Sequence, residues 1–224
     1  MTLVYNRLDD LASEGDKILD IGTKSGEHLA GVPGQVTAID LTIEPTADIE
    51  YALADGRELP FADDCFDYVT AAQVLEHVSD KQAMLDEVVR VLKPDGVFLV
   101  AFPNRIFPLD PHGLPPFFPW LPKRVVLTYL VGIGAHERYD YVLDQCFYLT
   151  SLQGRQMLES RFDRVSYETI EFSVEYSEIF QSRLGKLYKS LLPSIEFVTA
   201  TFPSGEWLFE LLFRHTAYEC RFSD

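Results

Sequence analysis

Two carboxylates and two glycines near the amino terminus have the types and spacing of a ligand-binding turn. Asp20 lies in the apolar segment Lys17–Ile21, which is too short for a helix and suits a strand buried on both faces. Gly22 and Gly26 follow, and glycine permits a backbone conformation or a close ligand approach that a Cβ would hinder. A second apolar segment then ends in Asp40, about 20 residues after the first strand. This order predicts a nucleotide-type ligand at the edge of a parallel sheet.

The positions of the glycines distinguish two kinds of nucleotide ligand. A dinucleotide turn has glycine at its first, third and sixth positions, which here hold Gly22, Lys24 and Glu27. The alternative pattern, acid-x-Gly-x-Gly-x-Gly, is met at three of its four positions by Asp20, Gly22 and Gly26. These residues resemble motif I of the class I S-adenosylmethionine-dependent methyltransferases.

Lys24 departs from that motif, because the family usually has its central glycine there. If the position requires a positive φ, a lysine costs roughly 1–2 kcal/mol. Its ammonium would either approach the carboxylate of the cofactor's methionine moiety or lie in solvent, and both alternatives stay open.

The resemblance continues over residues 55–102, and with motif I it covers residues 18–104. Asp55 follows a third predicted strand, where the family has an Asp that receives the adenine amino group; a turn-capping Asp before glycine is the alternative. After a fourth predicted strand comes Leu-Glu-His-Val, residues 75–78. Enzymes of the ubiquinone- and menaquinone-biosynthesis type carry a similar segment beside the transferred methyl group.

The resemblance implies S-adenosyl-L-methionine as the cofactor. Asp40 would take the ribose hydroxyls and Asp55 the adenine, with Gln73 on the other side. The implied cofactor-binding residues come from four segments: Asp20, Gly22, Lys24 and Gly26; Asp40 and Leu41; Asp55 and Gly56; and Gln73.

Methyl transfer from a sulfonium needs positioning and a dry site more than a catalytic triad. If the acceptor is a hydroxyl, a general base is useful, and histidine is the usual choice. His77, just past the fourth predicted strand, and His112, in the insertion described next, are the candidate catalytic residues, although each would more often be structural. No two histidines have metal-ligand spacing, so no metal is expected.

Residues 103–148 interrupt the alternation of strands and helices. Six prolines between Pro108 and Pro122 argue against regular structure, and Phe107, Phe117, Phe118 and Trp120 are interleaved with them. An insertion after the fifth strand lies by topology above the ligand-binding edge of the sheet. We expect an acceptor-binding lid; the alternative is a stiff loop whose aromatic residues fill a secondary core.

The pattern predicts one α/β domain over residues 1–224, with a doubly wound, mostly parallel sheet of about seven strands. The predicted strands cover residues 17–21, 36–40, 49–53, 66–71, 97–102, 165–172 and 217–222, the last antiparallel in the family pattern. The predicted helices include a short one at the amino terminus and residues 80–92, 152–159, 176–192 and 206–213.

Composition narrows the class of partners. The formal net charge of −16 is spread along the 224 residues, and such a surface repels the phosphate backbone of a nucleic acid. Three widely separated cysteines indicate a reduced, cytoplasmic compartment. The longest nearly apolar run, 125–135, is shorter than the about 20 residues that span a bilayer. The apolar carboxyl-terminal third could supply a homodimer face.

We therefore expect a methyltransferase that acts on a small-molecule, sugar or lipid-linked acceptor, with oxygen as the methylated atom. Three other functions are consistent with the sequence. The chain could be a methyltransferase-fold interaction module weakened by Lys24, a nicotinamide-dependent oxidoreductase, or a protein methyltransferase. The missing turn glycines disfavour the oxidoreductase.

The dispersed acidic charge predicts a halophilic-like response to salt. Self-repulsion among carboxylates is screened by added ions. The melting temperature should therefore rise as KCl is added, as thermal unfolding would show. Optimal folding in low-salt buffer would contradict this expectation.

Overall fold

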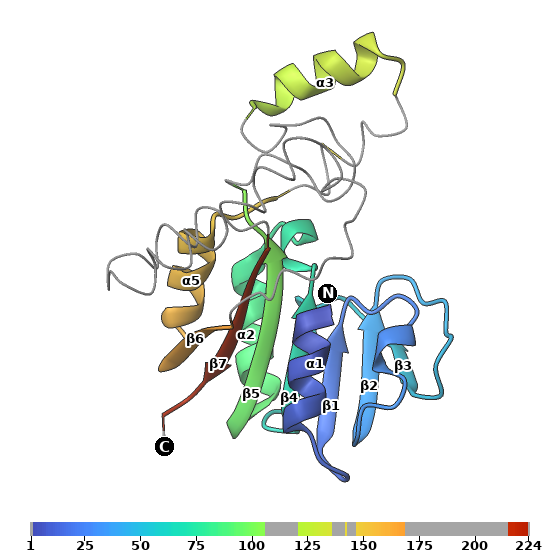
Figure 1. Ribbon diagram of the computed structural model, residues 1–224, viewed down its shortest axis with the longest axis vertical. Coiled ribbons are helices and arrows are strands. Elements are labelled where there is room, and N and C mark those ends of the chain that lie inside the picture. The colour runs from blue at the N-terminus through green and yellow to red at the C-terminus, as the bar shows by residue number, and fades with distance from the viewer. Residues whose placement is uncertain (1, 106–120, 136–141, 143–146, 169–214, 224) are drawn as a thin grey trace, which may run out of the picture.

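A seven-stranded mixed sheet forms the centre of the computed structural model, which describes residues 2–105, 121–135, 142, 147–168 and 215–223 (Figure 1). Its order is β3-β2-β1-β4-β5-β7-β6. The strands from β1 to β5 pair in parallel, while β7 runs antiparallel to β5 and β6. This arrangement confirms the predicted fold class and the antiparallel last strand. The strands are β1 Lys17–Ile21, β2 Gln35–Asp40, β3 Glu50–Leu53, β4 Phe66–Ala72, β5 Leu92–Pro103, β6 Arg164–Glu168 and β7 His215–Arg221.

Helices cover both faces of this sheet (Figure 1). One face packs on α1, and the other packs on α2 and α5. The α-helices are α1 Thr2–Leu11, α2 Lys81–Val91, α3 Lys123–Gly132 and α5 Ser151–Glu159, and two 3₁₀ turns are η1 Glu27–Leu29 and η2 Leu75–His77. None of the helices in the described ranges is long and apolar enough to cross a membrane.

Strand β1 is buried on both faces, as predicted. Ile18 packs with α1 residues such as Leu8, whereas Leu19 and Ile21 pack with α2 residues such as Leu85. The two-residue period of a strand thus sends alternate side chains into the two cores. Packing on both faces fixes the carboxyl end of β1. It therefore also fixes where the following turn begins.

The connections around this turn are short. The first helix after it is reduced to the three residues of η1, and residues 41–49 cross from β2 to β3 without a helix. The sequence predicts both features, because Pro33 and Gly34 stop a helix soon after Gly26, and Pro45 shortens the connection after Asp40. They leave the carboxyl ends of β1, β2 and β3 open along one edge.

Strand β5 begins earlier than predicted, at Leu92 instead of Val97. Its pairing with β4 shifts register between Phe66 and Tyr68, opposite the segment that contains Pro94 and Gly96. Proline cannot donate to a ladder and is tolerated at such irregularities. Pro94 and Gly96 therefore mark a bulge near the start of β5, just after the end of α2.

Helix α3 lies within the predicted insertion, residues 103–148, and directly follows the proline-rich segment 108–122 for which no regular structure is predicted. It begins after Pro122, its N-cap, where a missing N–H costs little. Val126 and Leu130 are buried with Val142 in a small separate core. In Figure 1, α3 lies beyond the carboxyl edge of the sheet. Outside the described residues lie His112, the four aromatic residues of the insertion, strand residues 169–172 and the helices predicted over 176–192 and 206–213.

The first turn of α2 contains a buried lysine. Asp80 caps the helix through a bond from the Ala83 N–H, as expected, and Lys81 follows with 8% of its surface exposed. The Lys81 ammonium donates to the Val78 carbonyl at 2.7 Å and lies 5.3 Å from the centre of the Phe147 ring. Burial lowers the pKa of Lys81 to about 8, although the charge of Glu76 opposes that shift. Between about pH 8 and pH 10.5, the Lys81 amine therefore binds fewer protons in the folded protein than in the unfolded chain.

We predict that Lys81 makes stability rise with pH. Because its pKa is lower in the folded state, the penalty on its charge is present below pH 8 and is relieved as pH approaches 10.5. From pH 7.5 to 10, the free energy of unfolding of wild type should rise relative to Lys81→Met by about 1–2 kcal/mol, measured by urea unfolding.

Lys93→Met is the matched control. The Asp67 carboxylate, 2.6 Å away, raises the pKa of Lys93, so this comparison should stay flat or fall with pH. If the difference in unfolding free energy between wild type and Lys81→Met does not change with pH, Lys81 does not have a lowered pKa in the folded protein.

Candidate active site

Seven of the predicted site residues line a single cleft at the carboxyl edge of the sheet. Its volume is about 210 Å³, and it is open to solvent. The predicted residues on its wall are Gly22, Asp40, Leu41, Asp55, Gly56, Gln73 and His77, joined by Ile21, Ile39, Ala54, Val74, Val78 and Met84. The sequence predicted only that these four segments end at the same edge of the sheet. The structure shows that their residues line one cleft.

Gly22 lets η2 approach the end of β1. Its φ of 80° lies in the left-handed region, and a Cβ there would collide with the Val74 side chain. Val74 precedes η2 and also lines the cleft. Because position 22 is glycine, Val74 and the η2 turn can lie close to the end of β1, which keeps the cleft narrow between them.

The glycine turn uses its backbone donors internally. Every N–H of residues 22–26 donates within the protein. The first two reach the Ile39 carbonyl, the last two reach the Thr23 carbonyl, and the Lys24 N–H reaches Asp40 Oδ2 at 3.0 Å. Anion-binding turns present free N–H groups, usually at a helix start. This turn instead leads into a three-residue 3₁₀ segment, so it lacks the donors that a pyrophosphate needs.

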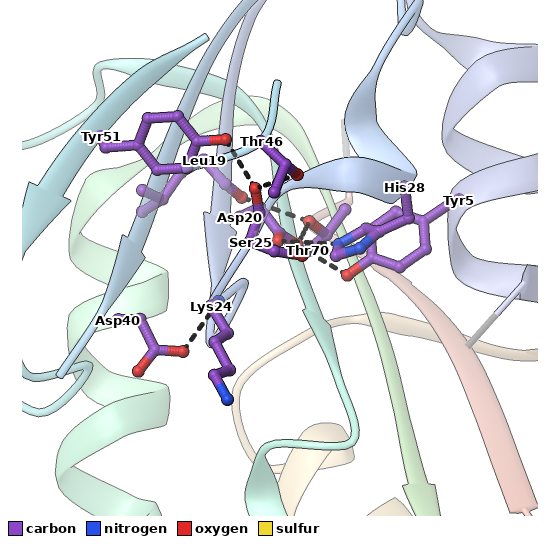
Figure 2. A network of polar contacts seen from close by, with 10 residues as sticks. All are labelled: Tyr5, Leu19, Asp20, Lys24, Ser25, His28, Asp40, Thr46, Tyr51 and Thr70. Carbon is purple, nitrogen blue, oxygen red and sulfur yellow. Dashed lines mark hydrogen bonds and ion pairs between the residues drawn. The ribbon is translucent and has the colours of Figure 1, made fainter. Parts of the chain in front are cut away.

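Lys24 does occupy the left-handed region, with a φ of 51°. The backbone strain expected for a lysine with a positive φ is therefore present at this position. The Lys24 ammonium is 3.6 Å from Glu44 Oε1 and its side chain is 62% exposed. Figure 2 shows that side chain directed away from Asp20 and Ser25. This conformation favours the solvated interpretation over a contact with a methionine carboxylate.

The Asp40 carboxylate is fixed at the cleft. Its Oδ2 accepts the Lys24 N–H, and its Oδ1 accepts the Thr42 N–H at 3.0 Å. Each carboxylate oxygen has a second acceptor position. A preorganised carboxylate of this kind can receive two neighbouring hydroxyls, as on a ribose.

Asp55 combines the two roles considered for it. Its Oδ1 accepts the Arg57 backbone N–H at 2.9 Å, which is a turn cap, and both its oxygens accept from the Arg57 guanidinium. Arg57 lowers the pKa of Asp55, so the carboxylate is ionised at neutral pH. The two side chains are 44% and 35% exposed, and such pairs are individually weak. An adenine amino group could therefore share Asp55 with Arg57, a residue that the sequence reading missed.

Gln73 has an unusual conformation for its type, with a φ of 61°. Its backbone N–H donates to the Ala101 carbonyl at 2.8 Å, which anchors the residue at the end of β4. Its buried Nε2 has no hydrogen-bond partner among the described residues. Buried polar atoms are usually paired, so this amide on the cleft wall suits a ligand acceptor.

His77 stands at the cleft with 32% of its side chain exposed. Its Nε2 lies 3.9 Å from Oε1 of the buried Glu76, so a carboxylate is near the ring. The His77 N–H bonds the Val74 carbonyl at 2.8 Å within η2. The imidazole thus lies on the cleft wall and is partly open to solvent.

Three of the predicted residues that the structure describes, Asp20, Lys24 and Gly26, do not lie on the cleft wall. Of these, Asp20 is the most deeply placed. It is fully buried behind the turn, where Tyr5 donates to Oδ1 at 3.1 Å and Thr70 donates a short bond to the same atom (Figure 2). His28 Nε2 lies 3.4 Å from Oδ2. Burial and the Asp20 charge raise the pKa of Tyr5, which keeps its hydroxyl protonated as a donor. In this conformation Asp20 anchors the turn to α1 and β4.

The cleft fits an adenosyl cofactor with a cationic tail. It has a fixed carboxylate for ribose hydroxyls, a second one for an amino group, an amide without a partner and apolar walls from Ile21, Leu41 and Met84. These are the groups that S-adenosylmethionine would require.

Known proteins share both the sequence pattern and the fold. Residues 19–100 match the family described as a methyltransferase domain. A ubiquinone/menaquinone biosynthesis C-methyltransferase UbiE from Pseudomonas fluorescens is 36% identical over 105 residues, which cover 38% of this chain and 41% of that protein. The UbiE of Psychromonas ingrahamii is 28% identical over 180 residues, 71% and 69% of the two chains. The first of these matches thus spans less than half of the relative.

Solved structures resemble the whole fold at low identity. Phosphoethanolamine N-methyltransferase 2 of Haemonchus contortus, in complex with S-adenosyl-L-methionine, superposes with a TM-score of 0.60 at 16% identity, over 100% of this chain and 52% of that one. The YcgJ protein of Bacillus subtilis gives 0.51 at 16% identity over 99% of both chains. Sheet order, glycine turn and family match agree: residues 19–100 are similar to a methyltransferase domain, and the fold is that of the class I, S-adenosylmethionine-dependent methyltransferases.

Proposed function

We propose that the protein transfers a methyl group from S-adenosylmethionine to a small-molecule, sugar or lipid-linked acceptor. The internal use of every N–H in residues 22–26 carries this proposal. A turn without free donors has no groups to bind an anion, and the ammonium and sulfonium of S-adenosylmethionine are cationic and require no such donors. A nicotinamide dinucleotide would need free N–H groups for its pyrophosphate. The turn therefore supports a methyltransferase over an oxidoreductase.

Each cleft residue then has a role in holding the donor. Asp40 accepts the ribose hydroxyls, Asp55 accepts the adenine amino group beside Arg57, and Gln73 donates to the bound nucleoside. Gly22 allows the turn to lie close to the methionine moiety. The bound donor supplies an activated methyl group, so the protein mainly orients the acceptor and excludes water.

His77 is the proposed general base. It removes a proton from an acceptor hydroxyl, which makes oxygen the methylated atom. The relatives are named C-methyltransferases, which favours an activated carbon acid as a second candidate acceptor. Either acceptor must lose a proton to a group in the cleft. His112 is the alternative base, in the part of the chain that the structure leaves undescribed.

The domain organisation, localisation and oligomeric state that we propose are those expected from the sequence. We propose a single domain, with residues 103–148 as a lid over the acceptor, and a cytoplasmic enzyme that forms homodimers. The position of α3 beyond the ligand-binding edge supports the lid (Figure 1). Limited proteolysis with and without donor would test it, because donor-independent cleavage within the insertion would count against closure.

Replacement of Asp40 should weaken donor binding. Asp40→Ala removes the acceptor for both ribose hydroxyls, so the affinity for S-adenosylhomocysteine should fall by about 2–3 kcal/mol, measured by calorimetry. Asp48→Ala changes the net charge equally at an exposed position outside the cleft and should bind as wild type does. Unchanged affinity in Asp40→Ala would remove Asp40 from the site.

Replacement of His77 should affect chemistry and leave binding intact. His77→Ala should lower the turnover of an identified acceptor by about 10²–10⁴-fold. Donor affinity should stay at the wild-type value, because no donor role is assigned to this ring. Turnover would be followed by radiolabelled methyl transfer to a panel of hydroxylated sugars and lipids. An unaffected rate would show that His77 is structural.

A further inference from the structure

We propose that Tyr51 is a positioning residue for the donor site, acting through the Ser25 carbonyl on the glycine turn and on Asp40. The inference rests on the proposed function, because it assigns the turn and Asp40 to a methyl donor. Tyr51 lies on β3, outside the cleft lining, so it does not itself contact the ligand.

Three donors, one from β3 and two from the segment that precedes it, meet one carbonyl of the turn. Ser25 O accepts from the Tyr51 hydroxyl at 2.7 Å, from the Thr46 hydroxyl at 2.9 Å and from the Thr46 N–H at 3.0 Å (Figure 2). A carbonyl oxygen has two lone pairs, so this oxygen is fully occupied. Its direction, and the direction of the peptide plane behind it, are therefore fixed.

The Tyr51 hydroxyl is itself oriented. The Ala47 N–H donates to it at 3.2 Å, which leaves its single proton for an acceptor. Ser25 O is the nearer acceptor at 2.7 Å, and the Ala47 carbonyl lies at 3.4 Å. The proton is thus directed at the turn.

Gly26 makes this approach possible. A Cβ on Gly26 would collide with the Tyr51 hydroxyl and would lie 2.9 Å from Ile49 Cδ1. The glycine that completes the sequence motif therefore has a packing role toward β3, whereas Gly22 lines the cleft.

The turn needs this support because Lys24 adopts a left-handed conformation that non-glycine residues rarely take. The Lys24 carbonyl accepts the Glu44 N–H at 2.9 Å, so the same inter-strand segment holds the residue beside Ser25 as well. Without these bonds, the turn could relax toward a less strained backbone.

The effect reaches the cleft through two hydrogen bonds. The Gly26 N–H, which shares a peptide unit with the Ser25 carbonyl, donates to the Thr23 carbonyl at 3.3 Å. The Lys24 N–H, which shares a peptide unit with that Thr23 carbonyl, donates to Asp40 Oδ2. If Ser25 moves, Lys24 moves with it, and Asp40 loses one of its two orienting donors. Tyr51 thereby preorganises the carboxylate assigned to the ribose.

The test compares two tyrosine hydroxyls that differ in location. Tyr51→Phe and Tyr68→Phe each remove a bond from a half-buried strand tyrosine to a backbone carbonyl, and the Tyr68 bond to Leu11 O is 3.0 Å long. Both variants should melt at similarly lowered temperatures. Affinity for S-adenosylhomocysteine, measured by calorimetry, should fall about threefold to tenfold in Tyr51→Phe alone. The KM for the donor should rise while kcat at saturating donor is unchanged.

A second pair of variants covers a folding failure of Tyr51→Phe. Thr46→Val removes one hydroxyl bond to Ser25 and should weaken donor binding, whereas Thr46→Ser keeps the hydroxyl and should bind normally. In an Asp40→Asn background, Tyr51→Phe should change affinity less than in wild type, because both act through the same carboxylate.

The possible outcomes separate this inference from the proposed function. Wild-type affinity in Tyr51→Phe, or an equal loss in Tyr68→Phe, would overturn the positioning role and leave the methyltransferase assignment standing. Full additivity with Asp40→Asn would overturn the path through Asp40. Absence of donor binding in wild type would overturn both proposals.

Discussion

The hydrogen bonds inside the turn between β1 and η1 are the constraint on which the site depends. Because the N–H groups of residues 22–26 bond within the protein, the turn cannot serve as an anion nest. Its φ angles also require glycine at two positions and strain a lysine at a third. One backbone conformation thus sets the charge preference of the ligand, the distance to η2 and the orientation of Asp40.

The rest of the domain holds that conformation from three directions. Behind the turn, the buried Asp20 carboxylate ties β1 to α1 and β4. Beside it, Thr46 from the segment between β2 and β3 and Tyr51 from β3 hold the Ser25 carbonyl. In front, Val74 fills the space that Gly22 leaves. These contacts come from different layers of the fold, so the site is a property of the assembled sheet and not of the motif alone.

The sequence predicted those parts of the fold that depend on local spacing. Strand β1, the reduced helix after Gly26 and the capped α5 follow from apolar period, proline and cap residues. Long-range partners carry no such signal: Tyr5 and Thr70 are 15 and 50 residues from Asp20. The burial of that carboxylate therefore depended on tertiary structure. The pairing of Asp55 with Arg57 is local, and the Asp-Gly-Arg order could have indicated it.

Calorimetric titration of the wild-type protein at high salt tests the central claim most directly. The ligands are S-adenosylmethionine, S-adenosylhomocysteine and NADH. A turn with its donors used internally predicts micromolar binding of the two adenosyl ligands and none of the dinucleotide. Binding of NADH, or of neither adenosyl ligand, would contradict the account and favour an oxidoreductase in the first case and an interaction module in the second.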